Sequence, residues 1–210
     1  MRVKICGLRT AIDVHAAIEA GADAVGFVFA KSVRQLDARG ARSLIGLVPA
    51  GILRVGVVRS VDSAPLEELF ALGLDAIQIE RDDQPVPGFP AGTRLWSVLR
   101  DGENLDARAA AIPPESTLII DSALGGGSGR SADLRRVATL AGARPIILAG
   151  GLTPDTVADA INRVHPCGVD VSSGVESAPG IKSPELIHAF VKAARDAAAG
   201  LPEGAIPSCP

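Results

Sequence analysis

Short apolar runs recur along the chain, and each is four to six residues long. They are rich in valine, isoleucine and leucine and do not alternate with polar residues, which is typical of strands buried on both faces. Their starts lie roughly 20 to 30 residues apart, so one helix fits between neighbouring strands. The runs span Arg2–Cys6, Ala24–Phe29, Leu53–Val58, Ala76–Ile79, Arg94–Leu99, Thr117–Asp121, Pro145–Ala149 and Gly168–Ser172.

Helical signals occupy most of the gaps. Apolar residues at helical spacing predict a helix over Thr10–Ala20 that stops at Gly21. Proline and capping signals predict three more helices: Pro65–Leu72, one that starts with a Thr153 cap and Pro154, and Glu185–Ala199 after Ser183 and Pro184. The gap after the fourth run, "RDDQPVPGFPAG", holds three prolines and two glycines, so we expect an irregular connection there in place of a helix.

Eight strand–helix units without a linker predict an α/β fold, namely a single (β/α)8 TIM barrel over residues 1–199. Residues 200–210 have no periodicity and are predicted to form a loose tail. An open doubly wound sheet is the alternative. It is disfavoured because no G-x-G-x-x-G follows the first run, and because candidate site residues follow many strands instead of one switch point.

Composition narrows the classes of partner. The chain is 47% apolar, and no apolar run approaches the roughly 18 to 20 residues of a membrane span. A formal charge of -3, scattered basic residues and few aromatic rings argue against nucleic acid as a partner. The chain enters a strand directly, without a secretory leader, so we expect a cytoplasmic protein that acts on a small molecule. The residue patterns of the predicted helices do not indicate an interface between subunits, so the oligomeric state is left open.

The cysteines Cys6, Cys167 and Cys209 cannot all pair within one chain, and they show neither C-x-x-C nor zinc-site spacing. We expect all three to be thiols, with Cys209 exposed in the tail. Cys6 differs because it ends the first strand, and the active site of a barrel lies at the carboxyl ends of its strands. A core thiol is the usual role of an isolated buried cysteine, but this position makes Cys6 a candidate base or nucleophile.

Two further charged residues follow strands at the same end. Asp121 comes directly after "TLII", where partial burial would raise its pKa and suit a general acid; a helix cap or a salt bridge to Arg130 is the alternative. Arg34 follows the second strand, and its planar fork suits a substrate carboxylate, whereas a solvated surface position is the alternative. Asp170 is interpreted as structural, bonded to backbone or to Lys4. The histidines, on or beside helices, are not expected to be catalytic: His15, His165 and His188.

Glycine- and serine-rich loops follow the last two strands. Gly150 and Gly151 have no side chains that would keep an anion from the backbone N–H groups, and their loop runs into a helix N-terminus. Ser172, Ser173 and Gly174 add hydroxyl and backbone donors. Loops after strands seven and eight bind phosphate in many barrels, so we predict a phosphate site, although glycines of this kind also serve simply to make tight turns.

Six stretches together resemble the phosphoribosylanthranilate isomerase family of tryptophan biosynthesis. The resemblance extends from residue 2 to about residue 195 and is carried by "VKICGLR", "GADAVGFVFAKSVR", "RVGVV", "IIDSALGGGSGR", "LAGGLTPDTV" and "GVDVSSGVESAPGIKS". It implies an Amadori rearrangement of N-(5-phosphoribosyl)anthranilate to 1-(2-carboxyphenylamino)-1-deoxyribulose 5-phosphate, an anionic sugar phosphate, without a metal or an organic cofactor.

The same resemblance implies roles for individual residues. Cys6 matches the family's general base, Asp121 its general acid, and Arg34 the arginine that meets the anthranilate carboxylate. The residues that it implies in phosphate binding are Gly126, Gly127, Gly129, Gly150, Gly151, Ser173 and Gly174, and the loop pattern adds Ser172.

The chain departs from the family pattern in two places. Glu80 and Arg81 stand where the family usually has histidine and glycine, and no aromatic residue follows "SVR" after the second strand. A carboxylate at position 80 either weakens the affinity for an anionic substrate or pairs with Arg81 or Arg100. The departure at Glu80 keeps a ligand-binding barrel without catalysis as an alternative. A related lyase or epimerase that acts on another sugar phosphate would use the same phosphate site and is the other alternative.

Overall fold

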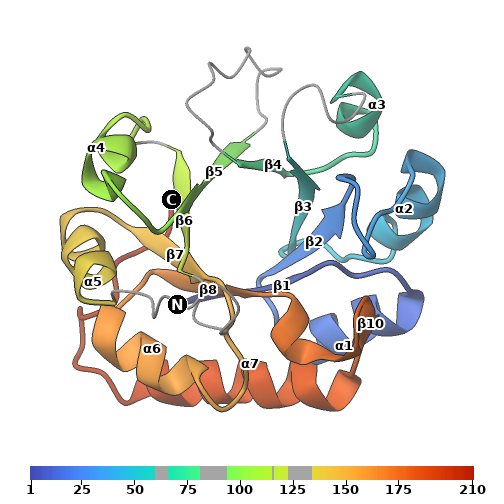
Figure 1. Ribbon diagram of the computed structural model, residues 1–210. Coiled ribbons are helices and arrows are strands. Elements are labelled where there is room, and N and C mark those ends of the chain that lie inside the picture. The colour runs from blue at the N-terminus through green and yellow to red at the C-terminus, as the bar shows by residue number, and fades with distance from the viewer. Residues whose placement is uncertain (60–65, 81–93, 115, 123–133) are drawn as a thin grey trace.

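The computed structural model describes residues 1–59, 66–80, 94–114, 116–122 and 134–210. Within them the chain forms a closed barrel of eight parallel strands surrounded by helices (Figure 1). The strands are β1 (Arg2–Cys6), β2 (Ala24–Val28), β3 (Leu53–Val58), β4 (Ala76–Glu80), β5 (Arg94–Arg100), β6 (Thr117–Asp121), β7 (Ile146–Ala149) and β8 (Gly168–Val171). The helices are α1 (Ala11–Glu19), α2 (Ala38–Ile45), α3 (Leu66–Phe70), α4 (Leu105–Ala110), α5 (Leu134–Ala143), α6 (Val157–Val164) and α7 (Pro184–Ala199). The prediction of a (β/α)8 barrel is confirmed.

The barrel closes where β1 pairs with both β2 and β8, in a register that places Lys4 beside Asp170. Every neighbouring pair of barrel strands is parallel, so all carboxyl ends lie at one end of the barrel. Cys6 at the end of β1 and Asp121 at the end of β6 therefore lie at the same end.

Predicted and observed strands differ by no more than one residue at either end.

Ser183 caps α7 as predicted, because its side chain accepts a hydrogen bond from the N–H of Leu186. The predicted start of α6 is wrong: the helix begins at Val157. The hydroxyl of Thr156 accepts from the N–H of Thr153, and residues 154–156 form a turn ahead of the helix. The proline-rich connection at residues 81–93 lies outside the described residues.

An element that the sequence patterns did not indicate follows β8. A short 3₁₀ helix over Ser173–Val175 leads into an antiparallel hairpin of β9 (Glu176–Ala178) and β10 (Ile181–Lys182). Gly180 makes the turn with a φ of 79°, a conformation that favours glycine. The hairpin extends the loop after β8 at the end of the barrel that holds Cys6.

Alternation along the strands separates two apolar clusters. Val3 and Ile5 face outward and belong to the larger cluster between the strands and the helices. A smaller cluster fills the barrel interior and includes Trp96 and Ile119, both fully buried. Because side chains of a strand alternate between its faces, Lys4 and Cys6 share the interior side of β1. The sequence places a lysine and a thiol on the inner surface of the barrel.

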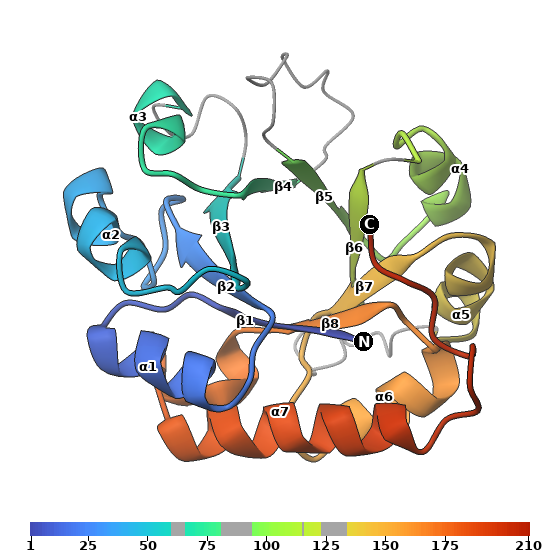
Figure 2. The same cartoon turned by 180° about the vertical axis from the view of Figure 1, so that it is seen from behind.

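The residues after α7 return across the opposite end of the barrel, where the chain also starts (Figure 2). Cys209 packs against the interior cluster, and a cavity of about 520 Å³ lies between this tail and the barrel. None of the predicted site residues lines that cavity. The boundary between barrel and tail at residue 199 stays a prediction.

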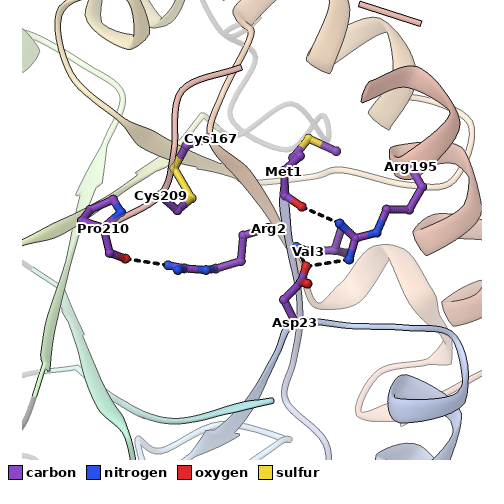
Figure 3. The surroundings of a disulfide bond; sticks show 8 residues. All are labelled: Met1, Arg2, Val3, Asp23, Cys167, Arg195, Cys209 and Pro210. Carbon is purple, nitrogen blue, oxygen red and sulfur yellow. Dashed lines mark hydrogen bonds and ion pairs between the residues drawn. A yellow bond between two sulfur atoms is a disulfide. The ribbon is translucent and has the colours of Figure 1, made fainter. Parts of the chain in front are cut away.

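Cys209 forms a disulfide bond with Cys167, just before β8 (Figure 3). The expectation of three free thiols is therefore wrong for these two residues, and Cys6 is the free cysteine. The two half-cystines are 42 residues apart in sequence, so local spacing gave no sign of the pair. Close by, the Arg2 guanidinium donates a hydrogen bond of 2.9 Å to the carbonyl oxygen of Pro210. The disulfide and this hydrogen bond hold the tail against the barrel.

Reduction of this disulfide is expected to lower the stability of the fold. In the loop-closure model, a crosslink across a loop of this length lowers the entropy of the unfolded chain and so raises its free energy by about 4 kcal/mol at 25 °C. Typical measured contributions to stability are about 2 to 4 kcal/mol. For a chain of this size the melting temperature should fall by roughly 5 to 15 °C. Thermal unfolding followed by circular dichroism with and without dithiothreitol measures the difference.

Cys209→Ser is the matched variant for this measurement. It should melt like the reduced protein and should no longer respond to dithiothreitol. Thiol titration of the denatured wild-type chain should give one thiol before reduction, from Cys6, and three afterwards. Equal melting temperatures of the oxidised and reduced wild type, with that thiol count, would contradict the stabilising role.

Candidate active site

A cavity of about 190 Å³ opens at the carboxyl ends of the strands. It is bounded by residues from β1, β4, β5, β6, β7 and β8 and by the loops that follow β7 and β8. Seven of the predicted site residues line it together: Cys6, Asp121, Gly150, Gly151, Ser172, Ser173 and Gly174. A thiol, a carboxyl group and two glycine-containing loops therefore surround one space.

Cys6 ends β1 and is 7% exposed. A Cβ atom placed on Gly26 of β2 would lie 2.8 Å from the Cys6 Sγ and 3.2 Å from the Lys4 Cε, so both side chains lie close against the bare backbone of β2. Burial raises the pKa of the Cys6 thiol, and the positive charge of Lys4 acts in the opposite direction. The thiol is accessible to the cavity yet largely shielded from water.

Lys4 and Asp170 form a buried ion pair beneath Cys6. The Lys4 Nζ lies 2.9 Å from each carboxylate oxygen of Asp170, so the predicted bond between them is present. Asp170 also lines the cavity, and its structural role stays a prediction. Burial alone would lower the pKa of Lys4, but Asp170 and Cys6 outweigh it and raise the pKa. Burial raises the pKa of Asp170, and the charge of Lys4 acts in the opposite direction. Because Nζ contacts both carboxylate oxygens, the contact is a charge-assisted ion pair.

Asp121 is half-buried at the end of β6 and projects into the same cavity as Cys6. Two backbone hydrogen bonds hold the end of β6 in place. The N–H of Asp101 donates to the carbonyl oxygen of Asp121 at 2.9 Å, and the N–H of the next residue, Ser122, donates to the carbonyl oxygen of Ala149 at 2.9 Å. The strand end is thus tied to β5 and β7. Arg130, the partner considered for Asp121, lies outside the described residues.

The loops after β7 and β8 are in direct contact. Gly150 and Gly151 have φ values of 92° and 65°, a region that side chains rarely adopt. A Cβ atom on Gly174 would lie 1.8 Å from the carbonyl oxygen of Leu152, so only glycine permits this approach of the two loops. The backbone of both loops therefore borders the cavity without intervening side chains at these positions.

Arg34 lies on the loop after β2 and does not line the cavity, but its stem is next to Gly7, the residue that follows Cys6. It is partly buried and pairs with Glu176 of β9, at 2.6 Å for Nε and 2.7 Å for Nη2. The alternative of a solvated surface arginine is therefore wrong. Burial raises the pKa of Glu176, but hydrogen bonds from Arg34, Lys182 and Gly180 outweigh it and lower the pKa to about 2.

Glu176 and Lys182 were not among the predicted site residues. Both lie in the stretch "GVESAPGIKS", where their charges are visible, but their pairing with the loop after β2 depends on the hairpin. A glutamate and a lysine six residues apart indicate no chemistry by themselves. The tertiary contact with Arg34 reveals them.

Glu80, the departure from the family pattern, is paired. Its carboxylate accepts a hydrogen bond from the Arg100 Nε, and the Arg59 Nε lies 3.8 Å from its other oxygen. Of the two outcomes considered for Glu80, pairing with Arg100 is the one observed. Its influence on substrate affinity stays a prediction.

Three predicted phosphate ligands, Gly126, Gly127 and Gly129, lie outside the described residues. Across the residues that the structure describes, no group of three or more histidine, cysteine, aspartate or glutamate side chains could hold a metal ion. No helix in the same part of the chain has the length and apolar character needed to cross a membrane.

The family model described as "N-(5'phosphoribosyl)anthranilate (PRA) isomerase" matches residues 3–193. An N-(5'-phosphoribosyl)anthranilate isomerase from Pseudomonas fluorescens (strain Pf0-1) is 40% identical over 202 residues, which covers 93% of this chain and 98% of the relative.

Solved structures are similar over the same extent. The phosphoribosyl anthranilate isomerase from Thermotoga maritima superposes with a TM-score of 0.80 at 32% identity, covering 93% of this chain and 99% of its own. A crystal structure of phosphoribosyl anthranilate isomerase in complex with reduced 1-(o-carboxyphenylamino)-1-deoxyribulose 5-phosphate gives a TM-score of 0.77 at 30% identity, with the same coverage.

Proposed function

The chain belongs to the N-(5'-phosphoribosyl)anthranilate isomerase family, an enzyme family of tryptophan biosynthesis, and on this premise we propose that Asp121 is its general acid and Cys6 its general base. The substrate is N-(5-phosphoribosyl)anthranilate and the product is 1-(2-carboxyphenylamino)-1-deoxyribulose 5-phosphate. The observation that carries the assignment is the single cavity lined by both groups beside the glycine loops after β7 and β8.

The reaction begins at the ribose ring. Asp121 gives its proton to the ring oxygen, the bond from C1 to that oxygen breaks, and the nitrogen lone pair forms a protonated Schiff base at C1. The positive charge makes the hydrogen on C2 acidic. The Cys6 thiolate takes that proton, and the C–H electron pair forms the C1–C2 double bond of an enolamine. Transfer of the hydroxyl proton at C2 and protonation of C1 then give the ketone.

The two charged ends of the substrate have separate partners in this proposal. The backbone N–H groups of Gly150, Gly151, Ser172, Ser173 and Gly174 bind the phosphate. Gly126, Gly127 and Gly129 contribute from the loop after β6. Arg34 binds the anthranilate carboxylate with its guanidinium. The phosphate loops and Arg34 lie at the same end of the barrel, so the sugar between them is held beside Cys6 and Asp121.

The cytoplasmic location of the protein stays a prediction.

Turnover of freshly prepared substrate tests the function directly. Purified protein should quench the fluorescence of the anthranilate sugar as the product forms, and the gene should restore growth of a tryptophan auxotroph that lacks this step. Binding of a product analogue at every pH without any turnover would support a ligand-binding barrel instead.

Asp121→Asn is expected to lower kcat about 100-fold, at the lower end of the range for general acids, because water can protonate the ring oxygen in its place. The asparagine side chain keeps the size of the carboxyl group but has no proton to give. Stopped-flow fluorescence at saturating substrate measures kcat. Asp159→Asn, on an exposed helix position paired with Arg163, is the control and should leave kcat unchanged. A kcat of Asp121→Asn within threefold of wild type would contradict the role of acid.

A further inference from the structure

The Glu176 carboxylate accepts four hydrogen bonds and is 4% exposed. Two come from Arg34, one from the Lys182 Nζ at 2.8 Å and one from the N–H of Gly180 at 3.1 Å. Charge-assisted bonds of this kind are short and directional, and a bidentate arginine contact fixes the plane of the guanidinium. Glu176 therefore determines how Arg34 is oriented.

Lys182 connects this cluster to the strand that holds the thiol. Its side chain is fully buried, and its Nζ donates to the carbonyl oxygen of Ser172 at 2.8 Å as well as to Glu176. The Ser172 hydroxyl in turn donates to the carbonyl oxygen of Cys6 at 3.1 Å. A continuous set of hydrogen bonds thus runs from Arg34 to the end of β1.

The stem of Arg34 lies against the backbone next to the thiol. A Cβ atom on Gly7 would lie 2.7 Å from the Arg34 Cδ, so the absence of a side chain at Gly7 makes room for the arginine. Arg34 is thereby held from two sides, by the backbone after Cys6 and by the carboxylate of Glu176.

A guanidinium has five N–H groups, and Glu176 uses the edge formed by Nε and Nη2. The neighbouring edge, formed by Nη1 and the second N–H of Nη2, has the fork geometry that matches another carboxylate. Within the described part of the chain no hydrogen bond is made by the Arg34 Nη1. This edge is available to a ligand.

We propose that Glu176 and Lys182 are positioning residues that set the specificity for the substrate's carboxylate by fixing the orientation of Arg34, whose Nη1 edge is left for that carboxylate. This inference rests on the proposed function, because it assigns the second edge of Arg34 to the anthranilate carboxylate. Glu176 contacts Arg34 and not the substrate, so its effect reaches the substrate only through Arg34.

The test compares two non-reacting ligands: reduced 1-(2-carboxyphenylamino)-1-deoxyribulose 5-phosphate and the same compound with an unsubstituted phenyl ring. In Glu176→Gln an amide replaces one of the two acceptor oxygens, so Arg34 loses one bond of its pair. The affinity for the carboxylated ligand should fall about 10- to 100-fold, the range for hydrogen bonds to charged groups. The affinity for the phenyl ligand should stay within twofold. Isothermal titration calorimetry measures both.

Two further variants separate positioning from a merely structural role. Arg34→Ala should show the same selective loss, and Glu176→Gln added to Arg34→Ala should cause no additional loss, because its route to the substrate is gone. Glu185→Gln, a glutamate that pairs with Ser183 at the start of α7, is the matched control and should bind both ligands like wild type. If Glu176→Gln fails to fold because Lys182 is left buried, the double variant Glu176→Gln, Lys182→Met removes both charges and takes its place.

Each outcome decides between the two proposals. Equal losses for both ligands in Glu176→Gln, or a full additional loss in the Arg34→Ala background, overturn the positioning role and leave the proposed function intact. A wild-type protein that binds neither ligand and turns over no substrate overturns the proposed function. The selective loss supports both.

Discussion

Cys6→Ala is expected to lower kcat by about 1,000- to 10,000-fold, the upper part of the range for general acid–base catalysis. The proton on C2 has no spontaneous route comparable to ring opening, because water is a much weaker base than a thiolate. Cys6 is placed for this task at the end of β1, in the cavity that Asp121 also lines. Removing the thiol leaves that cavity without a base at this position.

The pH dependence of kcat/KM gives a second measurement on the same residue. A base acts when it is deprotonated, and burial raises the pKa of Cys6, so kcat/KM of the wild type should rise as the pH increases toward the alkaline range. Cys6→Ala should lose this dependence. Iodoacetamide should inactivate the wild type faster at higher pH, since only the thiolate reacts.

Cys209→Ser is the matched control, because it also removes a sulfur but lies at the opposite end of the barrel. At 25 °C its kcat should equal that of wild type. A Cys6→Ala variant that keeps more than a tenth of the wild-type kcat would exclude the thiol as the base.

The architecture followed from the sequence because burial on both faces leaves a strong local pattern. A barrel strand such as Ile146–Ala149 needs apolar residues at every position, and runs of this kind recur at intervals that fit one helix. The positions of the candidate catalytic residues followed from the same assignment of strands. Once β1 and β6 were located, the positions of Cys6 and Asp121 at one end of the barrel were fixed by the parallel direction of the strands.

What the sequence did not predict depends on contacts between distant segments. The disulfide joins Cys167 to Cys209 across the amino-terminal end of the barrel, and no local spacing marks such a pair. The hairpin β9–β10 is only a few residues long, below the length at which periodicity is informative. The bond from Arg34 to Glu176 spans 142 positions and required both loops in place.

Lys4→Met is expected to lower the free energy of unfolding by about 3 to 5 kcal/mol, because it leaves the Asp170 carboxylate buried without its partner. Lys4 is fully buried and Asp170 is 7% exposed, so water replaces only part of the lost contact. Methionine has nearly the same length as lysine, which keeps the packing term small. Urea unfolding followed by circular dichroism at pH 7 measures the change.

Two comparison variants separate the charge effect from packing. Lys192→Met breaks an exposed pair with Asp196 on α7, and its cost should stay below about 0.5 kcal/mol because surface ion pairs contribute little. Adding Asp170→Asn to Lys4→Met replaces the buried carboxylate with a neutral group and should restore part of the lost stability. A double variant no more stable than Lys4→Met alone would show that the loss came from packing.

Lys4→Met should also change the pKa of the Cys6 thiol. The ion pair that joins β1 to β8 would then affect catalysis as well as stability. The positive charge of Lys4 lowers the pKa of Cys6, so its removal should raise that pKa and move the rate of iodoacetamide inactivation to higher pH. The same substitution then acts on two measurements through one charge, since Lys4 contacts Asp170 on one side and Cys6 on the other. An unshifted inactivation profile in a folded Lys4→Met protein would mean that Lys4 serves the barrel closure alone.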